Sequence, residues 1–306
     1  LDLFPGSFNL AADGGQRQLD VHTFVLEGLG DDLSAAASGT RYFISDPSIA
    51  TIDANGLVIA KAVGTAFITV VNGGRQGTVR LTVQQPRTGA VEVSAASGGV
   101  LRDELGNTLT IGAGTLNEDT VVSIRPLDLN TVETPILNNG LVDVLGAVQI
   151  SLNGVETNTP MQLALRINAP IDPLTGLPKQ LEPGTEVLFW REGEIRLPDG
   201  SVHKTWWLVD NGVIGADGVA RTASPPYNGI KIDGNLVCTT SKSVDANEQT
   251  GDLRLSGWAV NWQQMFVNFA FMPFAVSGFM GCGGVSGVVG LGVAAGALIM
   301  AAQTDL

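Results

Sequence analysis

Residues 66–83 read AFITVVNGGRQGTVRLTV, and this stretch decides the fold class. Apolar and polar side chains alternate on both sides of Asn72-Gly73-Gly74, and many of the apolar ones are β-branched. Because successive side chains of a strand point to opposite faces, this period of two is typical of half-buried antiparallel strands. Asn and Gly form tight turns because they tolerate left-handed backbone angles. The stretch therefore predicts strands at 66–71 and 78–83 with a turn between them.

The same pattern extends toward the N-terminus. Alternation recurs over residues 18–26, and turn-forming pairs such as Asp46-Pro47 and Asn55-Gly56 separate the strand-like runs. Several short strands at this spacing are typical of a β-sandwich. We therefore expect a mainly β protein in which residues 1–86 form one antiparallel β-sandwich. The alternation lapses at 84–89, where we expect a short linker.

A family resemblance supports this first domain. Residues 44–58 read ISDPSIATIDANGLV and residues 62–70 read AVGTAFITV. Together they resemble the bacterial Ig-like domain of group two, whose pattern is S-D-P-x-V-A-T-V-D-x-x-G-x-V-x-A-x-x-x-G-T-A-x-I-T. The resemblance covers about residues 1–85, with Tyr42-Phe43 where the family usually has a Trp. It implies an Ig-like fold that serves as a surface-exposed spacer or adhesion module, without catalysis.

A second series of predicted strands occupies residues 87–237, and we expect it to form a second antiparallel β-sandwich. The expected strands lie at 98–101, 107–111, 114–124, 146–152, 161–167, 183–190 and 205–209. Residues 109–124 fit the core pattern L-x-I-x-x-G-x-L-x-x-D-T-x-x-x-I, with Gly112 in place of a usual Pro. The order over about residues 90–235 resembles a ZU-five-like β-sandwich, whose bacterial relatives follow Ig-like repeats in large secreted proteins. Some members cleave themselves at a His-Phe-Ser-like motif that this sequence lacks, so we expect no autoproteolysis.

The C-terminal segment 238–306 differs in character, because residues 255–304 contain no Asp, Glu, Lys or Arg. Two apolar runs at about 265–280 and 285–302 flank a Gly-rich cluster, and each approaches the roughly 17–20 residues that a membrane-spanning helix needs. We therefore predict an apolar, Gly/Ala-rich helical hairpin. The residues assigned to membrane contact or helix packing are interfacial aromatics and G-x-x-x-G glycines: Trp258, Trp262, Gly283, Gly287, Gly292 and Gly296.

The partner of residues 255–304 stays open between a membrane and an apolar protein surface. A membrane anchor and an assembly interface both fit an uncharged segment, because interface cores also lose charged residues. A plug in a YD-repeat shell of the Rhs type fits the same composition, and so does a helix pair in a protein core. In every case but the last we expect self-assembly or membership of a larger complex.

Candidate chemical sites are few. The only histidines are His22 and His203, and no His or Cys spacing fits a metal site. Ser201, His203 and Asp199 lie close in sequence, but no nucleophile elbow precedes Ser201, so we interpret them as a hairpin turn. The Asp- and Asn-rich turns, such as 128–130, fit ordinary turn chemistry better than a calcium loop. We therefore expect no enzyme activity, no cofactor and no metal site.

The two cysteines flank the change in composition. Cys238 lies at the end of the second sandwich and Cys282 lies in the Gly-rich cluster. In an exported protein they could form a disulfide that ties the apolar segment to the sandwich. Their separation in space is not fixed by the sequence, so both a disulfide and two free thiols fit it.

Charge bounds the partners. The net charge of −13 repels a phosphate backbone, so we expect no nucleic acid partner. The chain begins at Leu1, and we expect a processed protein or an excerpt of a longer one. We predict a non-enzymatic extracellular or cell-envelope structural protein whose sandwiches project from an apolar anchor or assembly segment. The capping region of a YD-repeat secreted toxin shell and a subunit of an extracellular fibre fit the same features.

Overall fold

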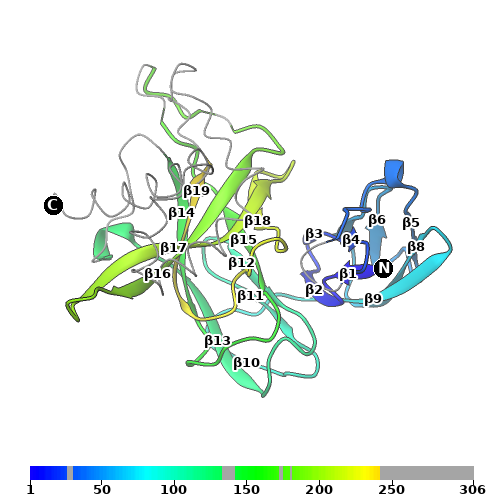
Figure 1. The fold of residues 1–306 in the computed structure, drawn as a ribbon, viewed down its shortest axis with the longest axis horizontal. Helices are drawn as coiled ribbons and strands as arrows, with labels where there is room; N and C mark the ends of the chain where they lie inside the picture. Colours follow the sequence, from blue (N-terminus) through cyan, green and yellow to red (C-terminus); the bar gives the residue numbers. More distant parts are fainter. Residues whose placement is uncertain (26–29, 133–141, 172–174, 180, 242–306) are drawn as a thin grey trace, which may run out of the picture.

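The computed structural model describes residues 1–25, 30–132, 142–171, 175–179 and 181–241. These residues form two β-rich domains that lie side by side (Figure 1). Within the described ranges the helical elements are two short 3-10 turns, η1 (Ala36–Ser38) and η2 (Leu129–Thr131). The prediction of a mainly β protein is confirmed.

The predicted C-terminal helical hairpin lies outside the described residues. The same holds for the residues assigned to it, which are Trp258, Trp262, Cys282, Gly283, Gly287, Gly292 and Gly296. In the part of the chain that the structure describes, no helix has the length and apolar character needed to cross a membrane. The assignments made for residues 255–304 therefore stay predictions.

The first domain packs sheets around one hydrophobic core. Within residues 1–25 and 30–86 the larger sheet has four strands, in the order β2 (Ser7–Ala11), β9 (Arg75–Gln84), β8 (Gly64–Asn72) and β5 (Arg41–Ile44). A three-stranded sheet in the same ranges has the order β3 (Gln16–Gln18), β7 (Leu57–Ala60) and β6 (Ala50–Ile52). A separate pair consists of β1 (Asp2–Phe4) and β4 (Asp20–His22). Side chains from all these layers meet in a common core, as a sandwich requires.

The hairpin predicted from residues 66–83 is confirmed. Strands β8 and β9 pair antiparallel from Gly64 opposite Val83 to Asn72 opposite Arg75. Ile68 and Leu81 are among the fully buried side chains, whereas Phe67 is exposed on the opposite face. The alternation in the sequence therefore corresponds to one buried and one solvated face.

Residues 18–26 differ from the single strand that their alternation predicts. The chain passes from β3 to β4 at Leu19, and these two strands belong to different sheets. Arg17, Leu19 and Val21 are all buried, so the period of two continues across the change of sheet. Phe24 is 66% exposed and lies beyond the end of β4. Periodicity thus predicts burial correctly, but hydrogen-bonding partners only in part.

One pairing in the first domain is parallel. Strand β2 pairs with β9 in the same direction, from Ser7 opposite Arg80 to Ala11 opposite Gln84. The prediction of a wholly antiparallel sandwich is therefore wrong at this pair. The parallel pair is possible because β2 and β9 lie at opposite ends of the domain sequence, and the intervening chain supplies the long crossover connection.

The second domain is built on one long antiparallel sheet. Within the described residues from 87 to 241 this sheet has ten strands: β10 (Val91–Val93), β13 (Thr120–Pro126), β14 (Val144–Ser151), β19 (Gly234–Thr240), β16 (Glu186–Arg196), β17 (Val202–Ile214), β18 (Val219–Thr222), β15 (Gln162–Arg166), β12 (Thr108–Ile111) and β11 (Gly99–Arg102). Strands far apart in this order, such as β14 and β15, come into contact. The sheet therefore curls over itself and encloses a core in the manner of a sandwich.

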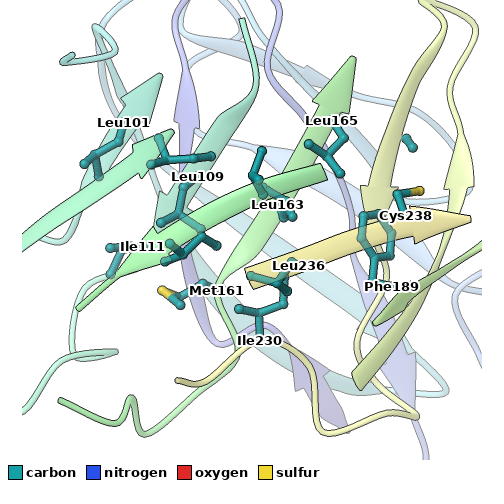
Figure 2. Close-up of a cluster of buried hydrophobic side chains, with 14 of the residues drawn as sticks. Leu101, Leu109, Ile111, Met161, Leu163, Leu165, Phe189, Ile230, Leu236 and Cys238 are labelled. Atoms are coloured by element: carbon teal, nitrogen blue, oxygen red, sulfur yellow. The ribbon is translucent and has the colours of Figure 1, made fainter. Parts of the chain in front are cut away.

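Buried side chains from both halves of this sheet form the second core. Leu109 and Leu163 come from one half and Phe189 and Leu236 from the other, and they gather in one cluster (Figure 2). Cys238 of β19 lies fully buried in the same cluster, close to Phe189 in Figure 2. Strand β19 extends to Thr240, three residues past the domain boundary that the sequence predicts at 237. Because Cys282 lies outside the described residues, the proposed disulfide stays a prediction.

Candidate functional site at the junction of the two domains

The predicted hairpin turn contains Ser201, His203 and Asp199 and lies between β16 and β17. The Ser201 hydroxyl donates to Asp199 Oδ1 at 2.6 Å and lies 3.2 Å from His203 Nε2. In a Ser-His-Asp triad the carboxylate orients the histidine, whereas Asp199 here accepts the N–H and the O–H of Ser201. The structure therefore brings these residues together as a turn, in an arrangement different from that of a triad.

Strand β2 of the first domain holds the second domain through side-chain hydrogen bonds. Ser7 Oγ donates to the Ala113 carbonyl at 2.9 Å, and Asn9 Nδ2 donates to the Ser97 carbonyl at 2.9 Å. Asn9 is almost completely buried, so its amide has given up water for this contact. A hydrogen bond of this kind contributes roughly 0.5–1.5 kcal/mol, and losing one partner leaves the other unsatisfied. The bonds therefore favour one orientation of the two domains.

The junction also contains close backbone packing. A Cβ atom added at Gly112 would lie 2.8 Å from the carbonyl oxygen of Ser7, which is closer than ordinary contact. On the other side of the junction, Gln162 Nε2 donates to the Gln16 carbonyl at 3.2 Å. The first domain thus contacts the second through both β2 and the start of β3 (Figure 1).

Buried charges lie at this junction. The guanidinium of Arg17 on β3 is almost completely buried and interacts electrostatically with Asp20 of its own domain and Asp210 of β17. Burial raises the pKa of Asp210 to about 7, partly offset by the hydrogen bond from Ser224 and by Arg17. Burial likewise raises the pKa of Asp20 to about 7. The other oxygen of Asp210, Oδ1, has no hydrogen-bond partner among the described residues. The cluster therefore carries charge at a cost in desolvation.

A polar hollow of about 90 Å³ lies between the domains. The turn from Asp13 to Gln16 lines it from the first domain, and strands β11, β12, β15 and β18 line it from the second. Its charged lining consists of Arg102, Arg166, Arg221, Asp13 and Asp217. Three of the 17 basic residues in this acidic chain therefore meet at one place.

The sequence carries no signal for this junction. Arg17 and Asp210 are separated by almost the whole of the two domains, and the arginines of the hollow come from three separate strands. None of them belongs to a short motif with a recognisable spacing. One local signal is present, the pair Gly14-Gly15 after Asp13, which marks a tight turn. That signal predicts a turn, but it does not indicate what the turn contacts.

Comparison with known proteins supports the first domain. Residues 30–83 match the family described as bacterial Ig-like domain (group 2), which confirms the class expected for this part of the chain. The chain is 27% identical over 177 residues to a protein named Ice-binding protein 1 from Shewanella frigidimarina (strain NCIMB 400). That similarity covers 53% of this chain and 19% of the relative, so the chain spans about a fifth of the relative's length.

One solved structure shows a low similarity. The crystal structure of the S-layer protein rSbsC(31-844) shares 11% identity with this chain and has a TM-score of 0.17. The comparison covers 70% of this chain and 38% of the S-layer chain. The ZU-five-like assignment of residues 90–235 stays a prediction. What the comparisons support is an Ig-like module in a protein of surface or structural role.

Proposed function

We propose that the chain is a non-enzymatic structural protein of the cell envelope or the extracellular space. Its two sandwiches form a spacer, and residues 255–304 attach that spacer to a membrane or to an apolar protein surface. The match of residues 30–83 to a bacterial Ig-like domain is the single observation that carries this proposal. Residues 87–240 act in it as a second, ZU-five-like sandwich, without autoproteolysis.

The contacts between the domains fit a spacer. A spacer transmits position only when its modules keep a fixed orientation, and a bare flexible linker would not hold one. Here buried Asn9 and the close approach at Gly112 join the modules directly after a short connection. The domain pair therefore works as one unit that projects from its attachment segment. The excess of acidic residues keeps such a unit soluble and away from nucleic acid.

Removing the apolar segment tests this function. Both hydrophobic cores, as far as the structure describes them, consist of residues before 242, so a chain of residues 1–241 is a suitable comparison for the full chain. We expect the full chain to fractionate with envelopes, or to assemble into large particles without detergent, and the shortened chain to stay monomeric. Limited proteolysis of intact cells should remove the sandwiches from the full-length protein. A full chain that is monomeric in detergent-free buffer would overturn the proposal.

A further inference from the structure

The floor of the hollow is set by the register of four strands. Arg102 of β11 lies opposite Thr108 of β12, and Thr108 lies opposite Ala164 of β15. Ala164 in turn lies opposite Arg221 of β18. Directly opposed residues of antiparallel strands share one face of the sheet. Two short side chains therefore separate two arginines, which leaves a basin with a guanidinium at each end.

Both of these arginines are already neutralised. Arg102 makes a two-pronged ion pair with Asp13, one prong of which is 2.8 Å long between Nη2 and Oδ1. Arg221 makes a similar pair with Asp217, at 2.8 Å and 2.5 Å. The Arg102 guanidinium lowers the pKa of Asp13, and the Arg221 guanidinium lowers the pKa of Asp217. The four side chains therefore contribute no net charge near neutral pH.

Arg166 supplies the charge that remains. It lies two residues beyond Ala164 on β15, lines the same hollow and has an exposed side chain. Among the described residues no acidic side chain forms an ion pair with it. Its Nε lies against Gly106 so closely that an added Cβ there would be 2.5 Å away. The glycine thus lets the guanidinium lie flat over the turn between β11 and β12, facing the hollow with one uncompensated positive charge.

Uncharged donors complete the lining. The hydroxyls of Thr108 and Thr110 and the amide of Gln162 border the hollow from the second domain. Gly14 and Gly15 border it from the first domain, where a side chain would fill space. The volume of about 90 Å³ is well below that of a pocket for a whole cofactor, which is roughly 300–1,000 Å³. The hollow therefore suits a single acidic group.

We propose that this hollow is a binding site for one carboxylate group, held by Arg166 and by the hydroxyl donors beside it. A guanidinium presents paired N–H groups that match the two oxygens of a carboxylate. One net positive charge in the lining favours a monoanion over a dianion. A free small carboxylate and the carboxylate of an acidic sugar polymer share this chemistry. Because the lining comes from both domains, binding also ties the two domains together.

Calorimetric titration of the full chain tests the site at pH 7 and constant ionic strength. The probes are sodium acetate, sodium glucuronate and a short oligoglucuronate, with sodium sulfate as the dianion. We expect a carboxylate to bind and Arg166→Gln to weaken that binding by about 10- to 100-fold, the range for a hydrogen bond to a charged group. Arg125→Gln is the matched control, because Arg125 is exposed on β13 and donates to Gln149 away from the hollow. It should leave the affinity unchanged.

The outcomes separate the sources and the rival explanations. Equal binding of acetate and glucuronate shows that the bare group is sufficient, whereas binding of the oligomer alone identifies an acidic polysaccharide as the source. Tighter binding of sulfate, or equal affinity in Arg166→Gln and the parent, overturns the proposal. So does the absence of heat for every probe at millimolar concentration. None of these results depends on where residues 255–304 attach, so this test and the test of the spacer function can fail independently.

Discussion

The substitution Asp210→Asn should make stability less dependent on pH. Asp210 is completely buried, its Oδ2 accepts from Ser224, and its Oδ1 has no partner among the described residues. Burial raises its pKa from 3.8 to about 7, a difference of about 3 units. At about 1.36 kcal/mol per unit this corresponds to about 4 kcal/mol. The figure is an upper bound, because Arg17 and the raised pKa of Asp20 couple to the same titration.

The sign follows from proton binding in the two states. Between about pH 4 and pH 7 the unfolded chain has released the Asp210 proton and the folded chain still holds it. The folded state therefore binds more protons, and stability falls as pH rises through this window. The contribution is fully present below pH 4 and is lost above pH 7. Asparagine removes the titration and can still accept the Ser224 hydrogen bond.

Urea unfolding of the full chain at half-unit steps from pH 4 to pH 8 measures the effect. We expect the free energy of unfolding of the parent to fall more steeply with pH than that of Asp210→Asn, with a difference that grows to at most about 4 kcal/mol by pH 8. Asp46→Asn is the control, because Asp46 is exposed in a turn of the first domain, and hydrogen bonds from Ser48 lower its pKa. Parallel pH curves for the parent and Asp210→Asn would refute the reasoning.

Three further substitutions or reagents probe the junction and the cores. Gly112→Ala places a Cβ 2.8 Å from the Ser7 carbonyl, so it should shift or loosen the domain pair in small-angle scattering, whereas Gly6→Ala meets no atom within 4 Å and should not. Phe189→Ala should destabilise the second domain by about 3–5 kcal/mol in urea unfolding, because a fully buried aromatic leaves a cavity, and a loss below about 1 kcal/mol would contradict this packing. The Cys238 thiol is buried with a raised pKa, so a thiol reagent should modify it only after unfolding; rapid modification of native protein at this position would contradict its burial.

Local patterns predict most of the strands, because burial along a strand is a local property. Residues 66–83 show this directly, since Ile68 and Leu81 are buried on the predicted face. The alternation at 17–21 also predicts burial, although the chain changes sheets at Leu19. Pairing is not local in this sense. The parallel contact of β2 with β9 joins segments some 70 residues apart, and no residue in either strand specifies its direction.

The junction could not be predicted for a related reason. Asn9 carries an ordinary strand polar pattern in the sequence, and only the neighbouring Ser97 carbonyl explains its burial. The three arginines of the hollow acquire a common role only when β11, β15 and β18 are neighbours in one sheet. Short motifs point instead to Ser201 and His203, which the structure places in an exposed turn.

The energies at the junction are small compared with those inside each domain. Its three side-chain hydrogen bonds contribute about 1 kcal/mol each, and the exposed Asp13–Arg102 pair less than about 1 kcal/mol. The domain orientation is thus held by about 3–4 kcal/mol, so the domains can separate without either one unfolding. A ligand at about 100 times its dissociation constant stabilises its bound form by about 2.7 kcal/mol. Occupation of the proposed carboxylate site would therefore nearly double the free energy that holds the two domains together. Such a ligand should act mainly on the stiffness of the spacer, and only weakly on the stability of its parts.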